Sequence, residues 1–240
     1  MEIFGIRAVM EAINSSKDID KVFIQIGLKG SLISTLESII RKNKINFSYV
    51  PKQKLDRLSK KNHQGVIARI SPIKLLDLNQ IDSIIADNGA PLLLILDQIN
   101  DVRNFGAIIR TAEVAGVTAV VIQNSSSAPI NSDTIKTSAG AIFNIPICKV
   151  NHIKDAIYHF KSLGISIVSA SEKADKNLYD TDFKKPVAIV IGSENKGINK
   201  SVLKISDEIV KLPMYGKIES LNVSVATAII LYEIQSQRDE

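Results

Sequence analysis

The sequence predicts an α/β protein, in which helices cover both faces of a mostly parallel sheet and a smaller mixed α/β unit comes first. Two observations favour this fold class. Residues 92–96 form an uninterrupted apolar run, which is typical of a strand buried on both faces. After this run, strand-like and helical segments alternate, and such alternation favours a parallel sheet. The length of 240 residues leaves room for two domains.

The smaller unit is predicted within the first 70 residues. Apolar side chains recur at helical spacing near residues 6–13 and 32–40. Strands are predicted at 21–26, 46–50 and 65–70.

A break separates this unit from the rest of the chain. Ser71-Pro72 ends the pattern, a modest helical stretch follows at 75–86, and Asp87-Asn88-Gly89 is a turn signal. We therefore predict a domain at residues 1–72, a linker at 73–89 and a second domain at 90–240.

The second domain carries the alternating pattern. Strands are predicted at 92–96, 117–122, 145–150, 165–169, 187–191 and 208–212, and helices at 104–115, 132–139, 152–163 and 221–237. Ligands of such sheets bind beyond the carboxyl ends of the strands. The loops after Leu96, Ile191 and Leu212 are therefore the candidate site.

Composition excludes several classes of protein. Hydrophobic residues are 45% and charged residues 23%, which is ordinary for a globular protein. The single cysteine, Cys148, allows neither an internal disulfide nor a Cys-rich zinc site, and we expect it to be a buried small hydrophobe. The three histidines are scattered, so we expect no metal, and we read His152 and His159 as surface or packing residues. No apolar run is long enough for a bilayer span, so we expect a soluble, cytoplasmic protein without a membrane partner.

The net charge of +5 lies in the first part of the chain. Residues 1–88 hold 14 basic and 9 acidic side chains, a difference of +5, and the remainder is neutral. A basic stretch at 41–61, interleaved with Phe47 and Tyr49, fits a surface that binds the phosphates of nucleic acid. A solvated lysine-rich face explains the stretch equally well.

The loop after the first buried strand leads into a helix that we expect to open near Asn104, a good N-cap residue. Arg103 and Arg110 are seven residues apart, so on a helix they point nearly the same way, an arrangement that suits phosphate capture. From the spacing alone, an exposed ion pair between Arg110 and Glu113 is the favoured alternative.

The other two loops are ambiguous when taken singly. Gly192 follows a buried strand and allows close approach of a ligand to the backbone, but a plain turn explains it as well. In the third loop, Leu212, Met214 and Leu221 could wall a pocket for a flat apolar group. Ser220 and Asn222 stand near the start of the last helix, where capping alone accounts for them.

Together and in this order, the segments 104–110, 191–197 and 212–226 resemble the three motifs of the SpoU (TrmH) family. These enzymes are RNA ribose 2′-O-methyltransferases that use S-adenosylmethionine. Phe4-Gly-Ile-Arg-Ala-Val9 with Glu11, and His63-Gln-Gly65, are similar to the family's L30e-like substrate-binding domain. The resemblance covers nearly the whole chain and is nearest to the bacterial branch that methylates a guanosine of 23S ribosomal RNA.

The resemblance implies a SPOUT-type fold in which the carboxyl-terminal segment threads a loop to form a deep trefoil knot. It implies a homodimer that uses the last helix in its interface. It also implies that the cofactor, S-adenosylmethionine, is contacted by Gly192, Leu212, Met214 and Leu221.

By the same resemblance Arg110 is the catalytic residue that assists the ribose hydroxyl, with Asn104 in support. Because arginine has a pKa of about 12.5 or higher, we interpret Arg110 as stabilising charge and orienting the ribose, with neutral guanidine as the alternative base. The remaining catalytic-site positions implied are Glu194, Ser220 and Asn222, and the implied RNA contacts are Arg103, His63 and Arg7.

Two further functions remain open at this stage. The catalytic motifs do not encode the RNA target, so a tRNA ribose methyltransferase is an alternative. A noncatalytic RNA-binding or ribosome-assembly protein with the same fold is another, although the polar positions of all three motifs are filled.

Overall fold

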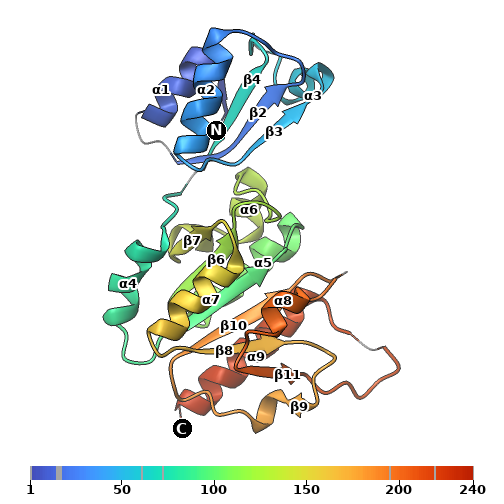
Figure 1. Cartoon of the computed structure of the whole chain (residues 1–240). Coiled ribbons are helices and arrows are strands. Elements are labelled where there is room, and N and C mark those ends of the chain that lie inside the picture. The colour runs from blue at the N-terminus through green and yellow to red at the C-terminus, as the bar shows by residue number, and fades with distance from the viewer. Residues whose placement is uncertain are drawn as a thin grey trace. The chain divides into compact units, whose positions relative to one another are not determined.

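The computed structural model of the chain describes residues 2–14, 18–60, 62–71, 73–194, 196–218 and 220–239. The chain forms two compact units, Met1–Lys74 and Leu75–Glu240 (Figure 1). Within the described residues, no helix combines the length and the apolar character that a membrane crossing needs.

The first unit is a sheet with helices on both faces. Its strands are β1 (Glu2–Phe4), β2 (Ile19–Gln25), β3 (Phe47–Val50) and β4 (Val66–Ile70), in the sheet order β1-β4-β2-β3. Its helices are α1 (Ile6–Asn14), α2 (Ser31–Lys42) and α3 (Lys52–Leu58). The three predicted strands and two predicted helices are present. The sequence analysis missed β1 and α3, which are short and lack a clear apolar period.

The two faces of this sheet have separate cores. Val9 of α1 and Leu36 of α2 pack with Val22 and Ile24 of β2. On the opposite face, Leu55 of α3 packs with side chains such as Phe23 of β2. The alternation of side chains along β2 therefore decides which helix each residue meets.

The second unit is built on a parallel sheet. Its strands are β5 (Leu92–Asp97), β6 (Ala119–Gln123), β7 (Ile147–Val150), β8 (Ser166–Ala170), β9 (Lys176–Asn177), β10 (Val187–Gly192) and β11 (Glu208–Lys211), in the sheet order β7-β6-β5-β10-β8-β11-β9. Every pairing is parallel, which confirms the predicted sheet. Of these strands only β9, which has two residues, was not predicted.

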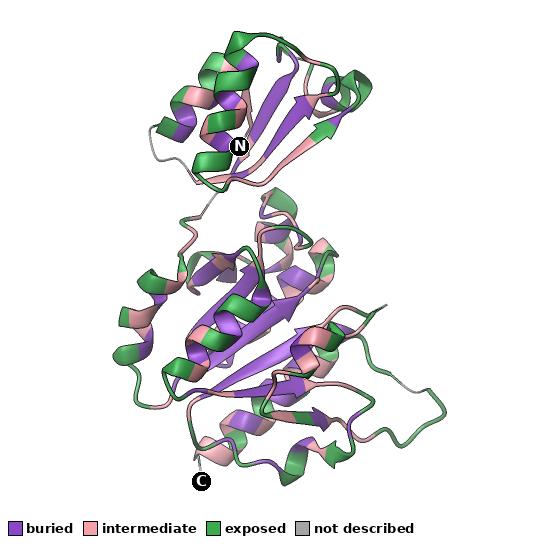
Figure 2. Ribbon diagram, viewed as in Figure 1, coloured by how far each residue is buried: buried purple, intermediate pink, exposed green. Residues whose placement is uncertain are grey.

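Helices cover both faces of this sheet. Helices α4 (Leu78–Ala86), α7 (Ile153–Ser162) and α8 (Lys200–Leu203) contribute to one core with alternate residues of β5 and β10, such as Leu93 and Ala188. Helices α5 (Val102–Val114) and α9 (Val223–Asp239) pack against each other on the other face. A short α6 (Ser132–Thr137) packs on α5. Figure 2 shows the central strands β5 and β10 buried and the outer sides of the helices exposed.

The predicted linker at 73–89 is largely part of the second unit. Residues Ile81 and Ile85 of α4 are buried in the core that α7 shares. Leu76 forms a parallel bridge with Cys148 at the edge strand β7. A helix with only a modest apolar stripe is therefore docked, because the edge of the larger sheet supplies its partner.

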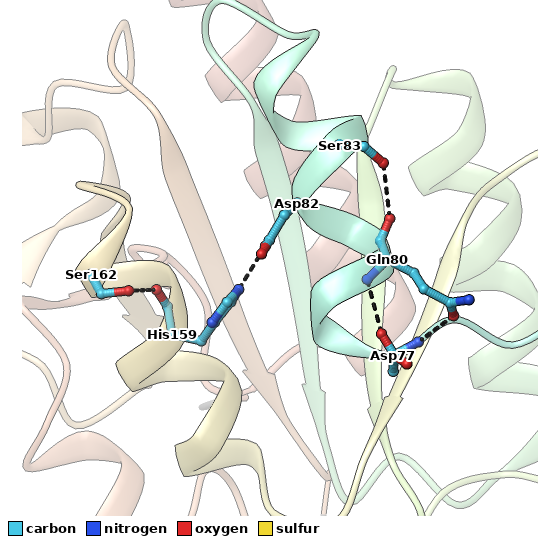
Figure 3. Close-up of polar contacts among 6 residues, drawn as sticks. All are labelled: Asp77, Gln80, Asp82, Ser83, His159 and Ser162. Carbon is cyan, nitrogen blue, oxygen red and sulfur yellow. Dashed lines mark hydrogen bonds and ion pairs between the residues drawn. The ribbon is translucent and has the colours of Figure 1, made fainter.

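Polar contacts fix α4 in this position (Figure 3). The side chain of Asp77 accepts a hydrogen bond from the Gln80 backbone N–H at 2.9 Å, and the Gln80 side chain accepts from the Asp77 N–H at 3.0 Å. This reciprocal pair caps the helix. The side chains of Asp82 of α4 and His159 of α7 form a hydrogen bond at 2.6 Å. His159 thus serves packing between two helices.

The buried Cys148 gives a pH dependence of stability. Burial, with the nearby carboxylates of Asp77 and Asp82, raises the pKa of its thiol to about 12. The folded state therefore holds this proton above pH 9 while the unfolded state releases it, so the contribution to stability is full below about pH 9 and falls as the pH rises toward 12. We expect wild type to lose about 1 kcal/mol more than Cys148→Ala between pH 8 and pH 10 in urea unfolding. Parallel pH profiles of the two proteins would contradict this.

The end of α9 is fastened by Arg238. Its guanidinium donates hydrogen bonds to the backbone carbonyls of Phe183, Ala90 and Lys185 at 2.9, 2.7 and 2.9 Å. These carbonyls precede β10 and β5, so Arg238 ties the last helix to the amino edge of the sheet.

Removal of Arg238 is expected to destabilise the second unit. Arg238→Ala leaves three carbonyls without these donors, and we expect the free energy of unfolding to fall by about 2–4 kcal/mol. Thermal unfolding should show a Tm roughly 5–10 °C lower. Lys184→Ala, which removes an exposed cation of the neighbouring loop, should change Tm little. Equal melting temperatures for the two variants would refute the fastening role.

Candidate active site

A cavity of about 370 Å³ lies at the carboxyl edge of the parallel sheet. The loops after β8, β10 and β11 and the first turns of α9 form its walls. Six residues that the sequence analysis placed in the site line it: Gly192, Glu194, Leu212, Met214, Ser220 and Leu221. A smaller hollow of about 160 Å³ adjoins it and is lined by Asn104, Gln98 and again Glu194. The three loops that were ambiguous singly thus meet at one place.

Three polar side chains from the three motifs form one hydrogen-bonded group. The Asn222 amide donates to the Asn104 side-chain oxygen at 3.0 Å and to the Glu194 carboxylate at 2.5 Å. The other end of Asn222 accepts hydrogen bonds from the backbone N–H and the hydroxyl of Ser224. Asn222 therefore caps α9 and joins the loops at the same time. The sequence analysis did not single out Ser224.

Gly192 is required by the loop that follows it. A Cβ at this position would lie 2.2 Å from the carbonyl carbon of Gly197 and 2.3 Å from the backbone nitrogen of Ile198. The chain folds back here, and the Gly197 N–H donates to the Ser193 carbonyl at 2.8 Å. The sequence leaves two interpretations of Gly192 open, close approach of a ligand to the backbone or a plain turn. The structure shows close approach of the chain's own backbone, at a residue that also lines the cavity.

The buried carboxylate of Asp97 binds the end of the same loop. Asp97, at the end of β5, is 2% exposed and accepts a hydrogen bond from the Asn199 backbone N–H at 2.8 Å. It connects the first and second loops. The sequence analysis missed Asp97, whose role depends on a partner 102 positions away.

Helix α5 begins earlier than predicted. Asp101 is its N-cap, because its carboxylate accepts a hydrogen bond from the Asn104 N–H at 2.8 Å. The prediction that Asn104 caps the helix is therefore wrong, and the Asn104 side chain is available to Asn222 instead. Because of this earlier start, Arg103 as well as Arg110 lies on the helix, and both side chains are exposed.

Arg110 does not line either hollow. It lies six residues beyond Asn104, roughly 9 Å along the helix axis, and the structure pairs Asn104 with Asn222. Within the described residues, Arg110 makes no ion pair, and the Glu113 carboxylate instead accepts a hydrogen bond from Asn144 at 3.4 Å. The predicted alternative of an Arg110–Glu113 pair is absent from this part of the chain.

In the first unit, the predicted RNA contact of His63 conflicts with its surroundings. His63 is 6% exposed, one ring nitrogen pairs with Asp56 at 2.9 Å, and the other accepts a hydrogen bond from the Gly65 N–H at 3.0 Å. Because both ring nitrogens form hydrogen bonds and the ring is buried, the structure does not favour His63 as an RNA contact. Arg7 is exposed on α1 and remains a candidate.

The described residues contain no group of three His, Cys, Asp or Glu side chains that could bind a metal ion. The site thus offers apolar walls, a connected group of amides and carboxylate, and backbone groups of tight loops. Such a set suits binding of an organic ligand with both flat and charged parts.

Comparisons with protein families match both units. Residues 91–232 match the SpoU rRNA Methylase family. Residues 3–76 match a family described as RNA 2'-O ribose methyltransferase substrate binding.

Individual relatives are similar over nearly the whole chain. The 23S rRNA (guanosine-2'-O-)-methyltransferase RlmB of Vibrio vulnificus is 35% identical, with 98% of this chain and 96% of the relative covered. The Bacillus subtilis protein YacO, whose name assigns it to TrmH family tRNA/rRNA methyltransferases, is 33% identical. The match covers 99% of this chain and 96% of YacO. The crystal structure of the SpoU methyltransferase AviRb from Streptomyces viridochromogenes with AdoMet has a TM-score of 0.64 at 22% identity. It covers 100% of this chain and 90% of that one, so it shows the shared fold.

Proposed function

The chain belongs to the SpoU rRNA Methylase family, and from this premise we propose that it transfers a methyl group from S-adenosylmethionine to the 2′-hydroxyl of a guanosine in 23S ribosomal RNA. The observation that carries the proposal is the meeting of the second and third family motifs around one cavity, to which the Asn104–Asn222–Glu194 hydrogen bonds join the first motif. Because ribosomal RNA is the proposed substrate, we also propose that the enzyme acts in the cytoplasm.

The cavity fits S-adenosylmethionine in size and chemistry. A volume of about 370 Å³ lies within the range of small-molecule sites. The side chains of Leu212, Met214 and Leu221 offer apolar walls for a flat base. Glu172 and Lys173 also line the cavity, and an amino acid with an ammonium and a carboxylate requires groups of both signs. When bound, S-adenosylmethionine supplies an electrophilic methyl group on a sulfonium.

The chain's residues must position the ribose hydroxyl and assist loss of its proton, because a hydroxyl is a poor acid. We assign orientation of the ribose and stabilisation of its developing charge to Arg110, which carries a fixed positive charge. The Asn104–Asn222–Glu194 group holds the three loops in register and borders the hollow nearest to α5. Ser220 contributes a hydroxyl to the cavity wall.

The proposal includes a threaded chain. The chain runs from β8 through β9 to β10 before it reaches β11. Strand β11 nevertheless lies between β8 and β9 in the sheet, so it is enclosed by the earlier connection between these two strands (Figure 1). The segment before β11 packs on the α7 face, through Ile198 and Val202. The segment after β11 reaches α5 on the other face. A chain that passes from one face to the other inside an earlier loop supports the trefoil knot.

A homodimer is supported by exposed apolar side chains on α9. Val225, Ile229 and Tyr232 are 46%, 37% and 55% exposed and recur at helical spacing. Val114 of α5, which is 63% exposed, lies four residues after Arg110 on the same helix face. A second copy seated on this surface would bury the apolar stripe and enclose Arg110 beside a site. We therefore propose that Arg110 acts at the dimer interface.

The RNA target rests on the relatives. The Vibrio vulnificus relative is named for 23S rRNA, which favours that substrate, whereas the broader name of the Bacillus subtilis relative keeps tRNA as the second candidate. Transfer of tritium from S-adenosylmethionine to purified 23S rRNA and to tRNA, followed by mapping of the modified nucleotide, tests the proposal. Methyl transfer to tRNA alone would show that tRNA, and not 23S rRNA, is the substrate. Transfer to neither RNA would refute the proposed activity.

A further inference from the structure

The first unit has a sheet face that helices cover only in part. Helices α1 and α2 pack on one face, while the short α3 lies on the other beside β2. Two rows of side chains cross this second face. Strand register places Phe4 opposite Ile67 and Ile67 opposite Phe23, and it places Glu2 opposite Arg69 and Arg69 opposite Lys21. The first row is apolar and the second is charged.

Three cations surround one aromatic ring on this face. The guanidinium of Arg69 lies 5.5 Å from the centroid of the Phe23 ring, and the ammonium groups of Lys21 and Lys54 lie 5.6 and 6.0 Å from it. These residues come from β4, β2 and α3. Phe23 is only 7% exposed, whereas Lys54 is exposed and the other two cations are half-buried. The ring therefore holds three positive groups at the surface by cation–π attraction.

The strand register also brings like charges together on this face. Like charges directly opposite on neighbouring strands repel, and Arg69 and Lys21 are such a pair. One acid, Glu2, lies on the far side of Arg69. The carboxylate of α3, Asp56, is bound to His63. Three cations that converge at one place on the surface of the first unit indicate a ligand that carries negative charge.

The surroundings indicate which kind of anion. On this face Ile67, Leu55 and Phe23 are buried, and Phe4 and Leu58 are partly buried, so the face lacks the fully exposed apolar centre of a protein–protein interface. Further cations, Lys52 and Arg57, extend from α3 beside it. Several cations fixed on a rigid sheet and helix suit the spaced phosphates of a nucleic acid.

We propose that the face formed by Lys21, Lys54 and Arg69 around Phe23 binds the phosphate backbone of the substrate RNA. The inference rests on the proposed function and specifies which surface of the first unit engages that RNA. Because Phe23 is nearly buried, it positions the cations and does not stack on bases. Affinity at this face is therefore independent of RNA sequence.

The structure also corrects the basic stretch at 41–61. Arg41 and Lys42 lie in the last turn of α2, while Lys52, Lys54 and Arg57 lie on α3, on the opposite face of the sheet. Phe47 and Tyr49 form an edge-to-face pair, and Phe47 packs in the α2 core. The stretch is thus two separate surfaces, and this provides a matched control.

The test compares two double variants of the full chain. Lys54→Gln/Arg69→Gln removes one lysine and one arginine from the proposed face, and Arg41→Gln/Lys42→Gln removes the same pair from α2. The probe is a fluorescein-labelled hairpin of 23S rRNA, titrated over a range of salt concentrations. Each lost phosphate contact should reduce the salt slope of log K by about 0.7–0.9. The first variant should therefore lose about 1.5 in slope and bind roughly 30-fold more weakly near 0.1 M salt. The α2 variant should match wild type.

Three results would overturn the proposal. The two double variants could lose equal affinity for the hairpin, or the Lys54→Gln/Arg69→Gln variant could lose none. Labelled polyglutamate could also bind wild type as tightly as the hairpin does and lose the same affinity in that variant. Thermal unfolding and S-adenosylmethionine binding, unchanged in the first variant, exclude misfolding as the cause. Methyl transfer separates this proposal from the activity. A wild type that transfers no methyl refutes the activity, whereas active wild type with an unchanged KM for RNA in the first variant refutes only the face.

Discussion

Arg110→Ala is expected to lower the rate of methyl transfer to RNA by about 10²- to 10³-fold, while S-adenosylmethionine binds as in wild type. The guanidinium lies outside the cavity and contacts no carboxylate within the described chain, so its loss should leave the fold and the cavity intact. Loss of a group that stabilises charge only as the reaction proceeds lowers kcat with little change in KM for the methyl donor. Single-turnover transfer of tritium measures this.

Two further variants make the Arg110 result specific. Arg110→Lys keeps the charge and loses the planar fork, so partial activity would indicate that charge matters more than bidentate geometry. Lys154→Ala removes an exposed cation of α7 and should leave transfer unchanged. Because Arg110 shares a helix face with Val114, the oligomeric state of each variant is measured by light scattering. Full activity of a dimeric Arg110→Ala protein would remove Arg110 from the mechanism.

The local pattern of the sequence predicted most of the fold. Continuous apolar runs such as 92–96 identify strands that are buried on both faces, and their alternation with helices predicted the parallel sheet. The two-residue strand β9 and the seven-residue helix α3 are each too short for an element of their kind to show a period. Helix α4 shows a period, but its docking depends on the edge of β7, which lies far along the chain.

The site was predictable as a set of residues and not as a set of contacts. The motifs identified Asn104, Glu194 and Asn222, and the structure joins them by hydrogen bonds. The motifs did not indicate that Asp101 caps α5, which leaves the Asn104 side chain free to bind Asn222. Asp97 and Arg238 were missed because each binds backbone groups of distant segments, and a backbone partner leaves no mark on the sequence.

Gly192→Ala is expected to cost both the cavity and part of the stability. The new Cβ would lie 2.2 to 2.5 Å from three backbone atoms of Gly197 and Ile198. Backbone cannot rotate away as a side chain can, so the loop 193–198 must move. Forced displacement of packed atoms costs about 1–3 kcal/mol, and a clash with backbone belongs at the upper end. We expect a drop of about 3 kcal/mol in the free energy of unfolding, measured in urea.

The same displacement should reach ligand binding. The moved loop carries Glu194, which borders both hollows and accepts the hydrogen bond from Asn222. We therefore expect at least tenfold weaker binding of S-adenosylmethionine by calorimetry, with methyl transfer reduced further because Asn222 loses its carboxylate partner. Gly89→Ala is the matched control, since nothing lies within 4 Å of its added Cβ. If Gly192→Ala and Gly89→Ala bind S-adenosylmethionine equally well, the folded-back loop does not form the binding site. The cavity at the carboxyl edge of the sheet is then not the site of the methyl donor.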